Sequence, residues 1–131
     1  MTLRGLYLVT PDLADTEALL SAVAEVLPAG PTLVQYRSKL PDPALRREQA
    51  GRLLELCRQV RVPLVINDDL SLALDIGADG AHLGRDDGDL TTARRALGPD
   101  RILGASCYGD WWRAEAAAAA EVDVRATAEA I

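Results

Sequence analysis

Three polar side chains at alternate positions form the stretch of this sequence best suited to chemistry. Gln35, Arg37 and Lys39 follow the apolar pair Leu33 and Val34 in the run LVQYRSK. Alternate residues of an extended chain share one face, so these three side chains would point the same way. One amide and two cations on one face suit an anion with several oxygens, such as a phosphate or diphosphate. The plainer interpretation is that Arg37 and Lys39 are solvated charges at a strand end.

The lysine at position 39 favours the anion-binding interpretation. The chain carries 14 lysines plus arginines and a net charge of -6, yet Lys39 is its only lysine. A lysine ammonium is a mobile point charge, whereas an arginine guanidinium is a rigid fork. A single lysine among arginines therefore indicates that an ammonium group is needed at this position. The acidic pI near 4.7 argues against nucleic acid or an anionic membrane as a partner. Anion binding would then be a local feature.

Size and composition predict a single domain over residues 1–131. The chain has 131 residues and is 49% hydrophobic, which is enough for one core but not for two comfortable ones. It has no apolar run of about 20 residues and no signal-peptide core at its start, which predicts a soluble cytoplasmic protein. Cys57 and Cys107 have neither a metal-ligand nor a disulfide spacing, and His82 is the only histidine. A histidine-rich metal site is therefore not expected.

Short apolar stretches alternate with helical patterns along the chain. Strands are expected at Leu6–Thr10, Thr32–Arg37, Pro63–Asn67, Gly80–Leu83 and Arg101–Ser106. Helices are expected after a cap at Asp15 or Thr16, after Asp42 with Pro43, over Leu70–Ile76, around Leu90–Leu97, and over Trp111–Glu121. This alternation indicates parallel strands joined by crossover helices, in an open doubly wound sheet or in a (β/α)8 barrel.

The positions of the polar residues favour the barrel. They fall at or just past the carboxyl ends of successive expected strands, which is where barrel enzymes place their active sites. These residues are Gln35, Arg37, Lys39, Asn67, Asp68, His82, Asp87 and Ser106.

Carboxylates at two neighbouring strand ends are candidate magnesium ligands. Asn67 and Asp68 leave the third expected strand, and Asp86 and Asp87 follow the fourth. Carboxylates that face cations could bind a magnesium ion carrying a diphosphate, with Asp68 and Asp87 as its ligands. The alternative is that each aspartate caps the next helix.

Three further residues could contact a substrate. Ser106 follows Gly104 and Ala105, whose small size lets backbone amides and a hydroxyl approach a phosphate. His82 could contact a heterocyclic ring, although a lone histidine in a strand is more often a core residue, and the same two interpretations apply to Tyr7. The sequence offers no convincing Ser-His-Asp or Cys-His set, so a covalent intermediate is not expected.

Together, four stretches make the chain resemble the thiamine-phosphate synthase family from Leu6 to Asp123. They are YLVTPD, VQYRSK, VPLVINDDLSLALDIGADGAHLGRDD and ILGASCY, in this order. The resemblance implies a small TIM barrel that joins hydroxymethylpyrimidine diphosphate to a thiazole phosphate, releasing diphosphate through a dissociative step. It also implies roles for individual residues: diphosphate binding by Arg37, Lys39, Asn67 and Ser106, Mg²⁺ binding by Asp68 and Asp87, a place near the metal and pyrimidine for Gln35, and a place in the pyrimidine pocket for His82.

The end of the chain departs from the family pattern. A barrel of this kind typically needs roughly 250 residues, so about five of its eight units are expected here. The family's Thr-Lys-Pro loop and its later glycine-rich turns are absent. Val124–Ile131 resembles the helix that would follow that loop, and in a genuine truncation Arg101–Ser106 would be an unpaired edge strand. Either the sequence is a partial record, which an intact mass above 14.0 kDa would support, or it is a truncation, which is expected to self-associate.

Two alternatives to the synthase remain at this point. One is a thiazole tautomerase, which shares the barrel and performs proton transfer, but should not need the Gln-Arg-Lys set or paired carboxylates. The other is a truncated domain that binds a pyrimidine phosphate, or only a partner, without catalysis. Calorimetry of hydroxymethylpyrimidine diphosphate with and without Mg²⁺ would separate them.

Overall fold

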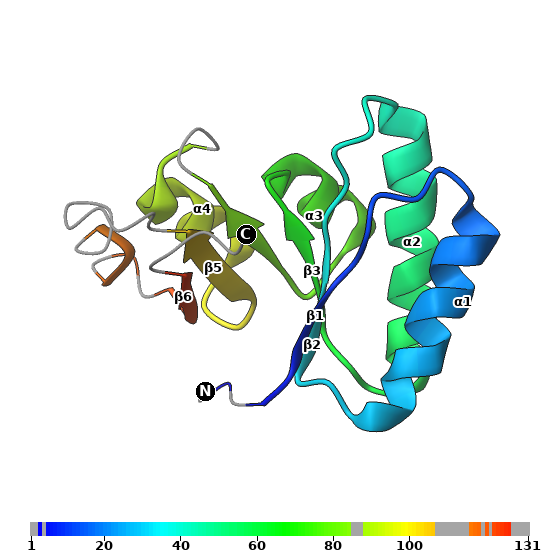
Figure 1. The fold of residues 1–131 in the computed structure, drawn as a ribbon. Helices are drawn as coiled ribbons and strands as arrows, with labels where there is room; N and C mark the ends of the chain where they lie inside the picture. The colour runs from blue at the N-terminus through cyan, green and yellow to red at the C-terminus, as the bar shows by residue number, and fades with distance from the viewer. Residues whose placement is uncertain are drawn as a thin grey trace.

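One sheet of parallel strands forms the centre of the molecule (Figure 1). The computed structural model describes residues 3, 5–84, 88–106, 116–118, 120 and 122–126. Within these residues the sheet has six strands in chain order, each pairing in parallel with the next. The strands are β1 (Tyr7–Val9), β2 (Leu33–Tyr36), β3 (Leu64–Asn67), β4 (Gly80–Leu83), β5 (Ile102–Ser106) and β6 (Val124–Ala126).

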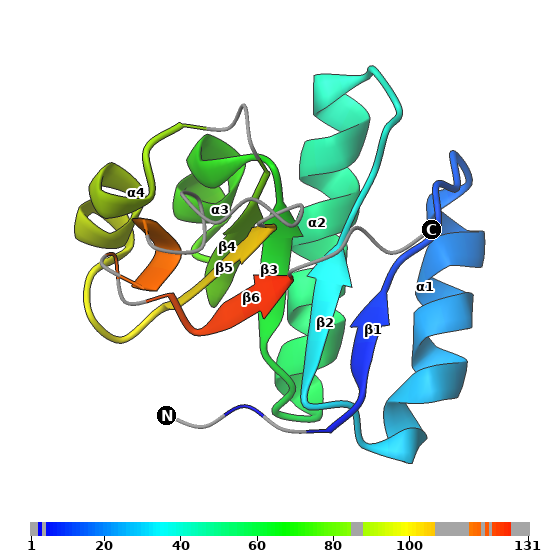
Figure 2. The ribbon, with the colours of Figure 1, turned by 60° about the vertical axis from the view of Figure 1, so that its left-hand side comes forward.

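The helices pack against one side of this curved sheet (Figure 2). They are α1 (Thr16–Val26), α2 (Pro43–Gln59), α3 (Leu70–Ile76) and α4 (Leu90–Leu97), with a short 3-10 turn, η1 (Leu27–Ala29), after α1. Each of the helices α1 to α4 begins after an aspartate whose carboxylate accepts backbone N–H groups of the first turn, a favoured helix N-cap. These caps are Asp15, Asp42, Asp69 and Asp89.

Alternate strand residues build two apolar layers. On the outer face, side chains such as Val34, Ile66 and Leu103 join the main core with the helices. On the inner face, a smaller cluster consists of Leu33, Val65 and Ile102, with Leu3 and Tyr7 packed against it. Strands buried on both faces, with helices outside, are the arrangement of a barrel wall. The described residues therefore form a partial (β/α)8 barrel, as the sequence predicts.

Cys57 belongs to the outer core. Its side chain is fully buried on α2, and burial raises the pKa of its thiol to about 11. The thiol therefore stays protonated at neutral pH, and Cys57 fills the core. Cys107 lies outside the described residues.

The prediction of a helix from Val124 is wrong. Val124–Ala126 is strand β6, with Gly104 opposite Val124 and Ser106 opposite Ala126, so β5 is not an edge strand. The residue before β6 fixes this pairing: the Asp123 N–H donates to the Leu103 carbonyl at 2.6 Å. Of the helix expected over Trp111–Glu121, residues 116–118 and 120 are described; residues 116–118 are helical and residue 120 lies in a turn.

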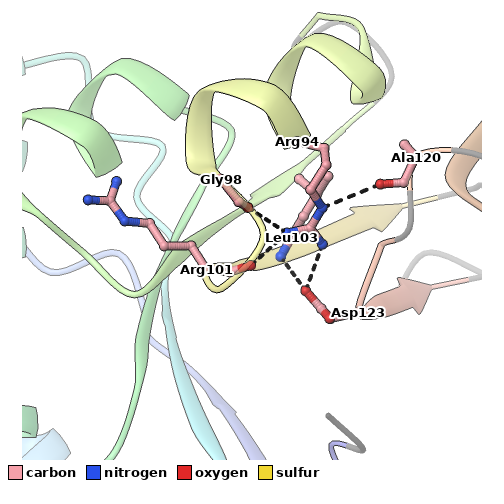
Figure 3. A network of polar contacts seen from close by, with 6 residues as sticks. All are labelled: Arg94, Gly98, Arg101, Leu103, Ala120 and Asp123. Carbon is pink, nitrogen blue, oxygen red and sulfur yellow. Dashed lines mark hydrogen bonds and ion pairs between the residues drawn. The ribbon is translucent and has the colours of Figure 1, made fainter.

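A polar network holds the start of β5 to the start of β6 (Figure 3). The Asp123 carboxylate accepts the Leu103 N–H and the Arg94 Nη2 group, both at 2.9 Å. The Arg94 guanidinium also donates to the carbonyls of Arg101 at 2.7 Å and Gly98 at 3.2 Å. The side chains of Arg94 and Asp123 are only 16% and 24% exposed. This partly shielded charge pair thus anchors the sixth strand.

Replacing Gly80 by alanine is expected to lower the free energy of unfolding by about 2 to 3 kcal/mol, as overpacking of a core does. A Cβ on Gly80 would overlap the backbone carbonyl of Ile102 in the paired strand β5. Moving that carbonyl would distort the β4–β5 ladder.

The matched control is Gly51→Ala in α2, where an added Cβ meets nothing within 4 Å. This change should stabilise the protein by up to about 1 kcal/mol through helix propensity. Urea unfolding gives the free energy of unfolding of both variants. Equal changes in that free energy would contradict the close contact between Gly80 and β5.

Candidate active site

The ends of β2 and β3 bring a cation and a carboxylate together. The Lys39 Nζ atom lies 3.8 Å from Asp68 Oδ2, and the two side chains are 58% and 38% exposed. An ion pair this exposed adds little stability, because water and salt screen it. Its significance is its location. The cationic stretch after β2 and the acidic residue after β3 lie at the same end of the sheet, as predicted.

Asp68 has a backbone conformation that is uncommon for a residue with a side chain. Its φ is 63°, in the left-handed region. Its N–H donates to the His82 carbonyl at 2.7 Å, which ties the end of β3 to β4. The cap of α3 is Asp69, which accepts the Leu72 N–H at 2.9 Å. The capping alternative for Asp68 is thus wrong, and its carboxylate faces Lys39. Strained backbone of this kind is concentrated at functional sites.

His82 and Ser106 form a second polar pair on the inner face. The His82 Nε2 atom lies 2.8 Å from Ser106 Oγ, and His82 is 8% exposed. A Cβ on Gly104 would overlap the His82 ring, so the glycine makes room for the imidazole. Asn67 is the partner of His82 in the β3–β4 register. Asn67, His82 and Ser106 therefore occupy neighbouring strands near their carboxyl ends.

Gln35 and Tyr7 also face the inner side of the sheet, where both line a small hollow with His82. The Tyr7 hydroxyl donates to the Leu3 carbonyl at 3.0 Å, and its ring packs on the inner apolar cluster. Tyr7 therefore lies below the strand ends, at the level of Leu33. Its substrate contact stays a prediction.

Arg37 and Asp87 are the remaining predicted site residues. Arg37 is exposed, directly after the last residue of β2. Asp87 lies outside the described residues, and the N-cap of α4 is Asp89.

A buried network behind the site was not predicted from the sequence. The Tyr36 hydroxyl donates to Gln49 Oε1 at 2.7 Å, and Gln49 Nε2 donates to the Leu13 carbonyl at 2.7 Å. Burial raises the pKa of the Tyr36 hydroxyl, which keeps it a donor. A signal was present: Gln49 lies four residues from both Leu45 and Leu53, on the apolar stripe of α2. A glutamine there has to find partners in the core.

Asp68 is the described carboxylate at the strand ends that could take part in binding a magnesium ion, with a phosphate substrate providing further oxygen ligands. Among the described residues no group of three or more His, Cys, Asp or Glu side chains could hold a metal by itself. Mg²⁺ is usually bound through one or two carboxylates together with substrate phosphates, not by an all-protein cage. Asp68, beside the cation Lys39, provides one such carboxylate.

Comparison with known proteins decides the family. The thiamine monophosphate synthase family model matches residues 6–128. The chain belongs to this family. It is 56% identical over 121 residues to the thiamine-phosphate synthase of Azoarcus sp., an alignment that covers 92% of this chain and 59% of that protein. It is 57% identical over 121 residues to the thiamine-phosphate synthase of Aromatoleum aromaticum, covering 92% of this chain and 58% of that protein. The chain thus spans less than two thirds of these family members.

A solved structure of the same family has the same fold. The thiamine phosphate pyrophosphorylase from Pyrococcus furiosus superposes with a TM-score of 0.77 at 28% identity, over 92% of this chain and 57% of that one. An archaeal fructose 1,6-bisphosphate aldolase superposes with a TM-score of 0.60 at 18% identity, over 81% of this chain and 53% of that one. The second likeness concerns the fold alone.

Proposed function

We propose that the protein is a thiamine-phosphate synthase, a transferase that joins hydroxymethylpyrimidine diphosphate to a thiazole phosphate, and that this chain holds its diphosphate site. The observation that carries the proposal is the meeting of Lys39 and Asp68 at one end of the sheet. A cation beside a carboxylate can hold a diphosphate and its metal ion together. The relatives named above are thiamine-phosphate synthases, which favours the synthase over a tautomerase.

In this proposal the cations stabilise the leaving group. The bond between the pyrimidine methylene carbon and the diphosphate oxygen breaks, and its electron pair leaves with the diphosphate. Arg37 and Lys39 hold the developing negative charge, and the Asn67 amide and the Ser106 hydroxyl donate hydrogen bonds to it. The thiazole nitrogen then forms the new carbon–nitrogen bond. The scheme requires no side-chain nucleophile.

Asp68 and Asp87 are proposed as the magnesium ligands, with Gln35 close by. When bound, Mg²⁺ would neutralise diphosphate oxygens and make departure easier. Asp68 is suited to this role because its carboxylate does not cap α3 and lies beside Lys39.

The inner face is proposed to hold the pyrimidine. His82 is fixed by Ser106 and fits beside Gly104, so its ring has a set orientation. Gln35, and below it Tyr7, line the same hollow. Two small molecules are therefore the proposed substrates.

The protein is proposed to be cytoplasmic and to self-associate. In the part of the chain that the structure describes, no helix combines the length and the apolar character that crossing a membrane requires.

The test is turnover by the protein with both substrates present. We expect thiamine phosphate and diphosphate to appear together, and removal of Mg²⁺ by a chelator to stop both. Binding of hydroxymethylpyrimidine diphosphate without any product would favour a non-catalytic domain. Isomerisation of the thiazole without release of diphosphate would favour the tautomerase. Either result would contradict the proposal.

A further inference from the structure

The hydrogen-bond ladder between β1 and β2 continues beyond the two strands. The last paired residues are Val9 and Gln35. The Thr10 N–H donates to the Gln35 carbonyl at 3.0 Å. Then the Thr10 side chain takes over, because its Oγ1 accepts the Arg37 N–H at 3.0 Å. Backbone pairing thus gives way to side-chain pairing at Arg37.

The next bond follows two residues later. The Lys39 N–H donates to the Asp12 carboxylate at 3.0 Å. The side chains of Thr10 and Asp12 therefore act as acceptors for the N–H groups of residues 37 and 39, where a strand would offer carbonyl groups. These bonds hold the backbone that carries both cations, although β2 itself ends at Tyr36.

The segment that supplies these acceptors is itself anchored in the core. Gln49, only 1% exposed, donates to the Leu13 carbonyl at 2.7 Å and to Thr16 Oγ1 at 3.3 Å. Thr10 is 3% exposed. A buried residue of α2 thus fixes the loop after β1, and that loop fixes the backbone at Arg37 and Lys39.

We propose that Thr10 and Asp12 are positioning residues of the anion site, which preset the backbone of Arg37 and Lys39 for a diphosphate. The inference rests on the proposed function. The proposed role of Asp12 involves two opposing effects. Its carboxylate repels an anion bound nearby, whereas its hydrogen bond to the Lys39 N–H holds the backbone in place for that anion. Its hydrogen bond to Lys39 must therefore help binding more than its charge hinders it. Because the charge weakens anion binding and the hydrogen bond strengthens it, variants that remove one or both of them test the proposal.

The experiment measures the affinity for inorganic diphosphate and for hydroxymethylpyrimidine diphosphate by calorimetry, in the presence of Mg²⁺. Asp12→Ala removes both the charge and the acceptor, whereas Asp12→Asn removes the charge and keeps an acceptor oxygen. We expect Asp12→Ala to bind diphosphate about fivefold more weakly, the effect of one lost hydrogen bond. Asp12→Asn should bind at least as tightly as the wild type.

A second pair tests the other support. Thr10→Val keeps the shape and removes the hydroxyl, and should weaken diphosphate binding about fivefold. Thr10→Ser restores the hydroxyl and should recover the affinity. The control is Asp75→Ala, which removes an exposed aspartate paired with Arg47 on α2. Amide hydrogen exchange of Lys39 should accelerate in Asp12→Ala and not in Asp75→Ala.

The possible outcomes separate the inference from the proposed function. If Asp12→Ala binds diphosphate as tightly as Asp12→Asn, the acceptor is unimportant and the inference is overturned, while the function stands. If the wild type binds inorganic diphosphate but not hydroxymethylpyrimidine diphosphate, the function fails and the inference is judged on inorganic diphosphate. If the wild type binds neither, both fail.

Discussion

Replacing Lys39 by alanine is expected to lower kcat/KM for hydroxymethylpyrimidine diphosphate by about 100- to 1000-fold, the cost of removing one preorganised group that stabilises a developing charge. The ammonium lies at the strand end, 3.8 Å from the Asp68 carboxylate. Lys39→Arg should recover only part of the loss, because the rigid fork of an arginine does not reproduce the mobile point charge of a lysine ammonium. Steady-state kinetics of product formation measure both variants.

The control for Lys39 is Arg47→Ala, which also removes one exposed positive charge. Arg47 pairs with Asp75 at 3.3 Å, between the helices α2 and α3. If the loss at Lys39 came only from the overall charge of the protein, both variants would lose activity equally. Such an outcome would contradict a diphosphate site at the end of β2.

Asp123→Ala is expected to lower the free energy of unfolding by about 2 to 4 kcal/mol, because it leaves a partly buried arginine without its charge partner. It also removes the acceptor of the Leu103 N–H. The loss should loosen β6, which is paired only with β5 among the described strands. Denaturant unfolding measures the loss, and amide exchange at Leu103 should accelerate.

Asp75→Ala is the matched control for Asp123, since it also removes an aspartate from an ion pair with an arginine. The side chains of Arg47 and Asp75 are 59% and 54% exposed. Removing so exposed a pair should cost at most about 1 kcal/mol. Equal losses for the two aspartates would show that the network in Figure 3 does not anchor the sixth strand.

The sequence predicted the helices and the first five strands because their signals are local. An aspartate precedes each of the helices α1 to α4, and short, mainly apolar stretches mark the strands. Strand β6 had no such signal: Val124–Ala126 contains a single β-branched residue, Val124, and begins the stretch VRATAEAI, which resembles a helix. Its pairing depends on Asp123 and Arg94, which contact residues distant in the sequence, and a local pattern cannot show such contacts.

The site was predictable to the same extent. Alternation from Gln35 to Lys39, and the position of Asp68 after the next strand, were enough to expect them at one end of the sheet. Sequence could not decide which of the adjacent aspartates, Asp68 or Asp69, caps α3, because either residue type can do so. The hydrogen bond from the Arg37 N–H to the Thr10 hydroxyl could not be predicted from the sequence either, since it joins residues that are 27 positions apart.

We propose that the cations after β2 and the carboxylate after β3 act on one metal-bound diphosphate. Calorimetry of hydroxymethylpyrimidine diphosphate with and without Mg²⁺ tests it most directly. We predict that Mg²⁺ tightens binding at least about tenfold in the wild type, because the protein carboxylate and the phosphate oxygens bind the same metal ion. Asp68→Asn should lose this gain in affinity. An affinity that is the same with and without Mg²⁺ in the wild type, or a full gain in Asp68→Asn, would contradict the claim.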